Sequence, residues 1–451
     1  MHRRFGSFLA VLLVTTCSAR AIGPTTKAND DSCDIAILPA ATLLLPYFEV
    51  DIGDAANQTT LLTVTNVVNV AQIARVTLWT DRSFPVMSFN LYLTGYDSES
   101  ISLYDIIANG IIGYGLPMGS SKSPVGDYSD PNAEHDAACA DLPVRIPADF
   151  VRRMQDAFTL GRSSTCTTIG SIGSIHANAV GYLTVDVVGN CSSNIPTDPE
   201  YFTTDIRYDN VLIGDYQQVS VREKHAQVNP MVHIRAIPEG GTPSSRAADP
   251  ANYGNRFSQT FYGRYQSESR PSSDARQPLP SRFAVRWING GFAAMGTSFK
   301  IWRQSTTGSM TCDALEKNGQ MLVGDSVAFD SRENAEGLVP DDCSVTTCFP
   351  APTPTLPATS LAAIDNLEAF PQSIISTTIN GWVYLNLDDG DVANGAHQSW
   401  VTVSMRASGD FSGDMDGAAL GNGCSPAVGP AEQSEDGSVV IGPSPNGEAQ
   451  P

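Results

Sequence analysis

Two groups of acidic side chains near the C-terminus have the composition of a calcium site. They are Asp388, Asp389, Asp391 and Asn394 in one Gly-containing loop, and Asp410, Asp414 and Asp416 in a second loop. Calcium takes about six to eight oxygen ligands, which clustered carboxylate and amide groups can supply. Neither group has the EF-hand spacing or a glycine-rich nonapeptide repeat. Solvated turns of an acidic protein therefore fit the spacing better than calcium does, and no other cofactor is expected.

Cysteine usage indicates disulfide bonds. An even number of cysteines follows a predicted signal peptide, which is typical of a disulfide framework in an exported chain. They are Cys33, Cys139, Cys166, Cys191, Cys312, Cys343, Cys348 and Cys424. We favour a bond between Cys166 and Cys191, which would enclose a predicted strand, and a bond from Cys312 to Cys343 or Cys348. Zinc is disfavoured, because the Cys343 and Cys348 pair has no second pair to complete a site.

Catalytic residue types do not form a familiar pattern. The histidines after the signal peptide include no H-E-x-x-H pair, and they are His135, His176, His225, His233 and His397. The segment from Gly170 to His176 contains Gly, Ser and His, but not in the order of a G-x-S-x-G nucleophile elbow. It is more typical of an approach to the next strand. Carboxylate pairs for glycoside hydrolysis meet only in space, so a secreted hydrolase stays an alternative rather than the preferred function.

Aromatic residues suggest contacts with sugars or with protein partners. Tyr96, Tyr104, Tyr114 and the group Tyr253–Tyr265 are expected in or beside loops, where exposed rings can stack on a sugar or anchor a partner. The tryptophans fall on predicted strands and are expected in the core; they are Trp79, Trp287, Trp302, Trp382 and Trp400.

The elements that would position these groups are mostly β-strands. Apolar stretches bounded by turn residues predict strands at Leu61–Thr65, Ile73–Thr80, Met87–Leu93 and Ser100–Leu103. In the second of these, Ala74, Val76 and Leu78 share one face, as the core of a sandwich requires. We expect an all-β protein built from immunoglobulin-like β-sandwiches.

Changes in composition along the chain predict its domain organisation. We expect a signal peptide at 1–21, an N-terminal β-sandwich at 34–114, a middle region with one helix at 115–237, a linker or exposed loop at 238–280, a C-terminal β-sandwich at 281–424 with a disulfide-rich insertion at 312–357, and a disordered tail at 425–451. Helical spacing of apolar residues predicts a helix at 148–160 that stops at Gly161. One larger sandwich with the middle region inserted is the alternative to two sandwiches.

The N-terminus and the net charge predict where the protein acts. A basic start, a short apolar core and the sequence Ala19-Arg20-Ala21 fit a signal peptide cleaved after Ala21, and a lipoprotein anchor at Cys17 fits less well. The chain has 27 Lys and Arg against 48 Asp and Glu, a net charge of −21, which repels phosphate backbones and argues against nucleic acid as a partner. No apolar run long enough for a transmembrane helix is expected in the mature chain. We expect a secreted protein of the extracellular space, cell surface or periplasm.

Several segments resemble a group of secreted bacterial β-sandwich proteins. They include LLPYFEVD at 44–51, TLLTVTN at 60–66, VTLWTD at 76–81, NLYLTGYD at 90–97, GWVYLNL at 381–387 and GNGCSP at 421–426. The resemblance implies a bacterial exported protein and one architecture over the mature chain. It carries over no activity and no binding residue.

These observations favour a structural or adhesive protein that acts through protein–protein contacts or self-assembly. Ile35–Val50 is expected to be an edge strand, because Pro39 and Pro46 cannot donate into a central ladder. An unpaired edge could add to the sheet of a neighbouring molecule. A secreted module that binds glycan or calcium is the alternative.

Overall fold

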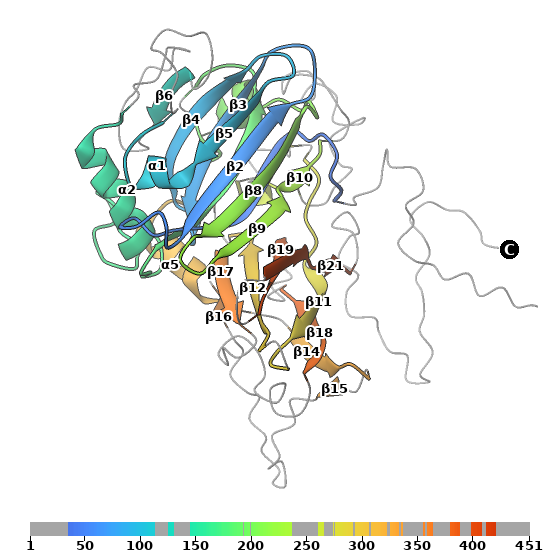
Figure 1. Ribbon diagram of the computed structural model, residues 1–451. Helices are drawn as coiled ribbons and strands as arrows, with labels where there is room; N and C mark the ends of the chain where they lie inside the picture. Colours follow the sequence, from blue (N-terminus) through green and yellow to red (C-terminus); the bar gives the residue numbers. More distant parts are fainter. Residues whose placement is uncertain are drawn as a thin grey trace, which may run out of the picture. The chain divides into compact units, whose positions relative to one another are not determined.

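The computed structural model describes residues 35–112, 125–129, 145–192, 194–198, 200–236, 260–265, 274, 276–291, 294–305, 308–322, 325–332, 335–336, 355–356, 359–363, 379–387, 398–407 and 412–420. All of them belong to one compact unit of the chain. Antiparallel strands are the main regular element of these residues and helices are few, which confirms the predicted β-rich class (Figure 1). The immunoglobulin-like topology stays a prediction.

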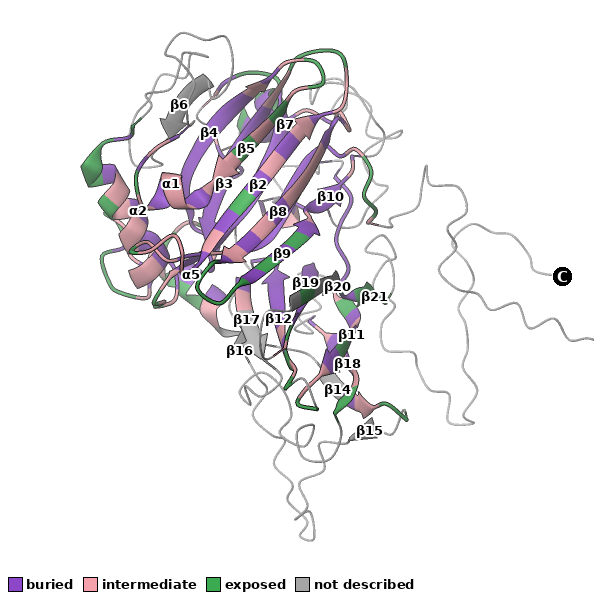
Figure 2. Ribbon diagram, viewed as in Figure 1, coloured by how far each residue is buried: buried purple, intermediate pink, exposed green. Residues whose placement is uncertain are grey.

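A six-stranded antiparallel sheet is the central element. Its strands, in spatial order, are β10 (Val232–Ile234), β1 (Thr42–Val50), β7 (Ala179–Val188), β3 (Gln72–Thr80), β4 (Pro85–Leu93) and β6 (Val125–Ser129). β7 is rich in Val, and all of its residues are buried (Figure 2). A strand that is buried throughout has protein on both faces, so this sheet lies between two layers.

A four-stranded antiparallel sheet shares a core with one face of the six-stranded sheet. Its order is β5 (Ser98–Ser102), β2 (Thr59–Asn66), β8 (Leu212–Ser220) and β9 (His225–Pro230). Val64 of β2 and Tyr216 of β8 belong to the same hydrophobic cluster as Val76 and Val185 of the larger sheet. The four successive predicted strands are confirmed as β2 to β5, and the predicted apolar face of β3 is buried in this cluster.

The strand β1 is not the edge strand that its prolines predict. It lies inside the sheet, paired with β10 through Thr42–Leu44 and with β7 over most of its length. Pro46 falls where the register with β7 shifts between Leu45 and Phe48. A bulge tolerates a residue that has no N–H to donate, so the proline marks an irregularity rather than an edge. The route to self-assembly through Ile35–Val50 therefore loses its physical basis.

The C-terminal strands form two further sheets and a short two-stranded one. The five-stranded sheet runs β15 (Ala335–Glu336), β14 (Asp325–Asp330), β18 (Asn380–Asn386), β11 (Arg282–Ile288) and β21 (Ala418–Ala419), and the four-stranded sheet runs β17 (Thr359–Ala363), β12 (Gly296–Arg303), β19 (Ser399–Arg406) and β20 (Ser412–Asp416). β13 (Met321–Leu322) pairs with β16 (Thr355–Leu356).

The second core joins the C-terminal sheets to the remaining face of the six-stranded sheet. Trp79 of β3 and Tyr182 of β7 belong to the same hydrophobic cluster as Trp287 of β11 and Trp302 of β12. β7 to β10 come from the range expected as a middle region; β7, β8 and β10 pair with β1, β2 or β3, and β9 pairs with β8. Strands from distant parts of the sequence therefore complete each layer.

The helices that the described residues form are short, and the longest of them packs on the six-stranded sheet. They are α1 (Leu103–Ile107), α2 (Ala148–Leu160), α5 (Cys312–Lys317), a π-helix at Tyr201–Asp205, and 3₁₀ turns at Gly263–Tyr265 and Asn318–Gln320. α2 has the predicted bounds, and Phe150, Met154 and Phe158 on its inner face are buried. It ends at Gly161, whose φ of 59° is a left-handed conformation that glycine adopts without steric cost.

Candidate functional site

The predicted calcium residues fall largely outside the described part of the chain. Outside it are Asp388, Asp389, Asp391, Asn394 and Asp410. Asp414 lies on β20, where only its backbone is described. Asp416 Oδ1 accepts a hydrogen bond from Trp400 Nε1 at 3.2 Å. Among the side chains that the structure describes, no three His, Cys, Asp or Glu residues are grouped to hold a metal ion. The calcium site stays a prediction.

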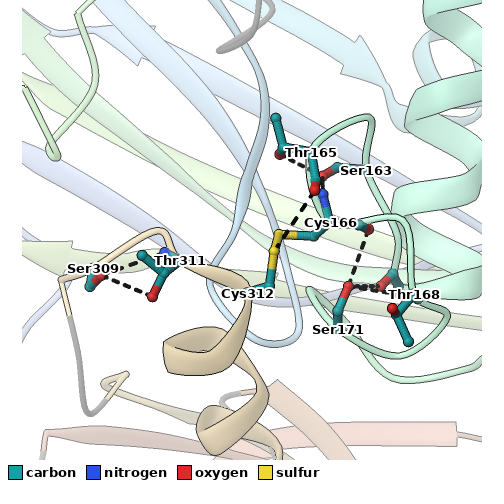
Figure 3. Close-up of a disulfide and its surroundings, with 9 residues drawn as sticks. Ser163, Thr165, Cys166, Thr168, Ser171, Ser309, Thr311 and Cys312 are labelled. Atoms are coloured by element: carbon teal, nitrogen blue, oxygen red, sulfur yellow. Dashed lines mark hydrogen bonds between the residues drawn. A yellow bond between two sulfur atoms is a disulfide. The ribbon is translucent and has the colours of Figure 1, made fainter.

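The cysteine pairing differs from the expected one. Cys166 is bonded to Cys312 rather than to Cys191, and their Cα atoms lie 5.6 Å apart (Figure 3). The bond ties the loop after α2 to the first residue of α5. Cys191 is disulfide-bonded as well. The remaining cysteines are outside the described residues: Cys33, Cys139, Cys343, Cys348 and Cys424. Proximity in sequence was the wrong guide, because the bonded pair is 146 positions apart.

Asp81 and His176 form the best oriented acid and imidazole pair in the described residues. Asp81 Oδ2 lies 3.0 Å from His176 Nε2, and the same carboxylate accepts the backbone N–H of Ser174. A hydrolase of the serine type needs a hydroxyl on the other ring nitrogen. Ser171 instead donates to the carbonyl oxygen of Thr168 at 2.7 Å, and the described residues place no serine hydroxyl in hydrogen-bond contact with His176. The pair anchors this loop to the end of β3.

A buried polar cluster centres on Asp186 in β7. Its carboxylate accepts hydrogen bonds from the Thr42 hydroxyl and the Tyr201 phenol, each at 2.5 Å, and from the Tyr262 phenol. Arg276 Nε lies 3.7 Å away. Burial, and then the negative charge of Asp186, raise the pKa values of Tyr201 and Tyr262 well above the ordinary value, so both phenols stay protonated donors. The side chain of Asp186 is 1% exposed, which leaves no access for a substrate. The cluster is structural.

The aromatic residues are divided differently from the expected pattern. Phe261, Tyr262 and Tyr265 were expected in an exposed loop but are buried in the second core. Tyr96 is 71% exposed in a turn, as predicted. Trp382 is the exception among the strand tryptophans, since it is only half-buried. The other four are buried, as predicted. Tyr114 and Tyr253 are outside the described residues.

A pocket opens beside β5, the first strand in the order of the β5-β2-β8-β9 sheet. It has a volume of about 260 Å³, and Phe89, Leu91 and Ile106 contribute to its apolar wall. Glu99 and Asp105 contribute carboxylates. Drug-sized ligands occupy pockets of roughly 300–1,000 Å³, so this pocket suits a single side chain rather than a cofactor. No sequence pattern indicated it, because its wall combines residues of both sheets and of α1.

The local structure of α1 fixes one side of this pocket. Ser102, the last residue of β5, caps α1 by accepting the backbone N–H of Asp105 at 3.2 Å. The Asp105 carboxylate accepts the Asn109 amide at 3.2 Å. β5 pairs with β2 from Ser98 to Ser102 and has no partner strand on its other side among the described residues. The edge of β5 therefore lies beside a pocket that has an apolar wall and two acidic side chains.

Comparison with known proteins adds no assignment. No family model, curated protein or solved structure matches this chain. Among the described residues, no helix combines the length and the apolar character that crossing a membrane requires.

Proposed function

We propose that this is an exported structural or adhesive protein that acts through protein–protein contacts, with the β5 edge as its contact surface. The observation that carries the proposal is the pocket beside that edge. An extended segment of a partner would add to the sheet alongside β5 and place one side chain in the pocket. The main-chain hydrogen bonds would supply affinity, and the pocket would supply specificity.

The chemistry of the pocket favours a basic partner segment. Its apolar wall accommodates the methylene groups of Lys or Arg, while the Asp105 carboxylate attracts the terminal charge. The chain itself carries a net charge of −21, so a second copy meets long-range repulsion. β5 is short and has no Lys or Pro, which are residues that commonly block strand edges. An inward-pointing acid at Glu99 instead disfavours an acidic strand.

The proposal also includes export of the protein and an immunoglobulin-like fold of its sheets. A signal peptide at 1–21 and the even number of cysteines after it support secretion to the cell surface, extracellular space or periplasm. Antiparallel sheets that face each other across one core are compatible with an immunoglobulin-like sandwich. Glycan or calcium binding is the alternative function, and a secreted hydrolase is the least favoured.

The test is binding of fluorescent eight-residue peptides, measured by polarisation at physiological ionic strength. One peptide alternates Val with Lys, and its counterpart alternates Val with Glu. We expect the Lys peptide to bind and the Glu peptide not to bind. Asp105→Lys should weaken binding of the Lys peptide at least tenfold. Glu223→Lys, an exposed acid paired with Arg406 elsewhere, is the matched control and should change it less than twofold.

The melting temperature of each variant establishes that it is folded. Binding that is absent for both peptides, or lost equally in the two charge reversals, would overturn the proposal.

A further inference from the structure

The outward face of the five-stranded sheet carries a row of half-exposed aromatic rings. Burial alternates along β18: Val383 and Leu385 face the core, whereas Trp382 and Tyr384 are half-exposed on the opposite face. Phe329 of β14 pairs with Trp382 in register, and their rings stack with centroids 4.0 Å apart and planes 10° apart. Half-exposed aromatic rings grouped on one face of a sheet are the kind of apolar surface that marks a binding site.

Arginines flank this aromatic row. On β11 the core residues Phe283, Val285 and Trp287 alternate with outward positions, and the outward Arg282 and Arg286 are exposed. Arg286 pairs in register with Trp382, on the side opposite to Phe329. Arg282 pairs with Asn386 farther along the same strand. Trp382 therefore has Phe329, whose ring stacks on the indole, as its register partner on β14 and Arg286 as its register partner on β11.

Two strands of this face carry a charge opposite to that of the chain, while on β14 the same face includes the position of Asp325, which pairs in register with Asn386. Acids outnumber bases 48 to 27 in the sequence. At the outward positions of β11 and β18, which the structure describes in full, the only charged side chains are Arg282 and Arg286. A protein with a strong negative charge that places two exposed arginines beside aromatic rings offers a local site for an anion. Guanidinium groups bind carboxylates and sulfates through paired hydrogen bonds.

We propose that this face, formed by Phe329, Trp382, Tyr384, Arg282 and Arg286, binds an acidic polysaccharide. Sugar rings would lie against the aromatic row, because the C–H faces of a pyranose and an aromatic ring are both apolar. The uronate or sulfate groups of the same chain would pair with the arginines. The site is separate from the β5 edge, so it does not depend on the peptide contact proposed there. An exported adhesive protein would thereby hold a glycan on one surface and a protein on another.

A carbohydrate fits this surface better than a protein strand does. The aromatic residues lie on a sheet face rather than at an edge, since β18 is paired with β14 on one side and with β11 on the other. Main-chain addition is therefore closed at this position, and recognition has to come from side chains. Ring stacking together with charge pairing is what side chains on an open sheet face can supply.

The experiment is affinity electrophoresis of the mature protein in gels that contain polygalacturonate, heparin or neutral dextran. EDTA is present throughout, so that metal bridging by the acidic loops does not contribute. We expect retardation by at least one of the two polyanions and none by dextran. Trp382→Leu keeps apolar cover over Phe329 but removes the indole, and it should raise the apparent dissociation constant about tenfold. Tyr384→Thr, a replacement that β-strands accommodate well, should also raise the apparent dissociation constant.

Matched controls separate recognition from folding and from ion exchange. Tyr96→Ala removes an aromatic ring that is 71% exposed elsewhere and should leave retardation within twofold of the unmodified protein. Arg286→Gln should weaken binding, whereas Arg153→Gln, at an exposed arginine of α2, should not. Absence of retardation by either polyanion would overturn the proposal. So would retardation that persists in both aromatic variants, because it would reveal simple ion exchange.

Discussion

Arg276 Nε lies 3.7 Å from Asp186 Oδ1, and the side chains of both residues are almost completely shielded from solvent. Strand register explains why the carboxylate is there: Asp186 in β7 lies between Thr42 of β1 and Arg75 of β3. The guanidinium group of Arg276 also donates to the carbonyl oxygen of Arg207 at 2.9 Å and lies over the Tyr208 ring. A buried charge requires such partners, because it has lost its contact with water. The contacts of Arg276 and Asp186 thereby link four separate segments of the chain.

Replacing Arg276 with Met should destabilise the protein strongly. The substitution leaves the Asp186 carboxylate buried without its countercharge, and breaking a buried pair in this way costs about 3–5 kcal/mol. Arg153→Met is the matched control, because Arg153 pairs with Asp149 at 2.9 Å on the surface of α2, where solvent screens the pair and its loss should change stability little. Urea denaturation of both variants measures the difference. An equal decrease in the free energy of unfolding of the two variants would show that the buried pair stabilises the protein no more than the exposed pair does.

The Cys166–Cys312 bond should be found by mass spectrometry of unreduced peptides, and its removal should lower stability. Replacing both cysteines with Ala avoids a free thiol. Because the bond closes a loop of 146 positions, the chain-entropy argument assigns it about 5 kcal/mol. Denaturation of the double variant against the unmodified protein measures this contribution. A peptide that links Cys166 to Cys191 would contradict the structure and restore the pairing expected from the sequence.

Local patterns predicted the strands well, because burial in a sheet imposes a period of two that the residues themselves display. Ala74, Val76 and Leu78 are an example, and the apolar spacing and stop residue of α2 are another. The features that failed depend on three-dimensional neighbours. Pro46 suggested an edge strand, because the sequence around it does not reveal the bulge that accommodates the proline.

The candidate sites were harder to predict for the same reason. The pocket beside β5 combines residues from strands of two sheets and from α1. Trp382 looks like the other strand tryptophans in sequence, yet it faces outward because of its register on β18. Alternation with Val383 and Leu385 was the available signal. Using it would have required knowing which face of the strand meets the core.

The pH dependence of stability should report the buried imidazole of His225. Burial, and then the positive charges of Arg406 and Lys300, lower its pKa from 6.5 to about 4. The folded protein thus favours the neutral ring, and the unfolded chain binds the proton first as the pH falls. Stability from this group is fully present above pH 6.5 and is lost progressively as the pH falls toward 4.

His225→Leu isolates this contribution. Neither ring nitrogen of His225 has a hydrogen-bond partner among the described residues, so the apolar replacement should cost little at pH 7. Denaturation curves of the variant should depend less on pH between 6.5 and 4.5 than those of the unmodified protein. His233, whose pKa burial also lowers, is present in both proteins and does not affect the comparison. Parallel pH profiles would show that His225 does not titrate in the way its burial implies.

Two glycines in the turn after α2 share a left-handed backbone conformation but differ in the space available for a Cβ atom. Gly161 and Gly170 both have positive φ, 59° and 82°. A Cβ atom on Gly161 would lie 1.8 Å from the carbonyl oxygen of Gly173, whereas nothing lies within 4 Å of a Cβ atom on Gly170. Gly170→Ala should therefore cost only the left-handed penalty of about 1–2 kcal/mol. Gly161→Ala adds a backbone clash that overpacking data place at about 1–3 kcal/mol. Denaturation of both variants should rank Gly161→Ala as the more destabilising, and the reverse order would mean that the turn relaxes away from Gly173.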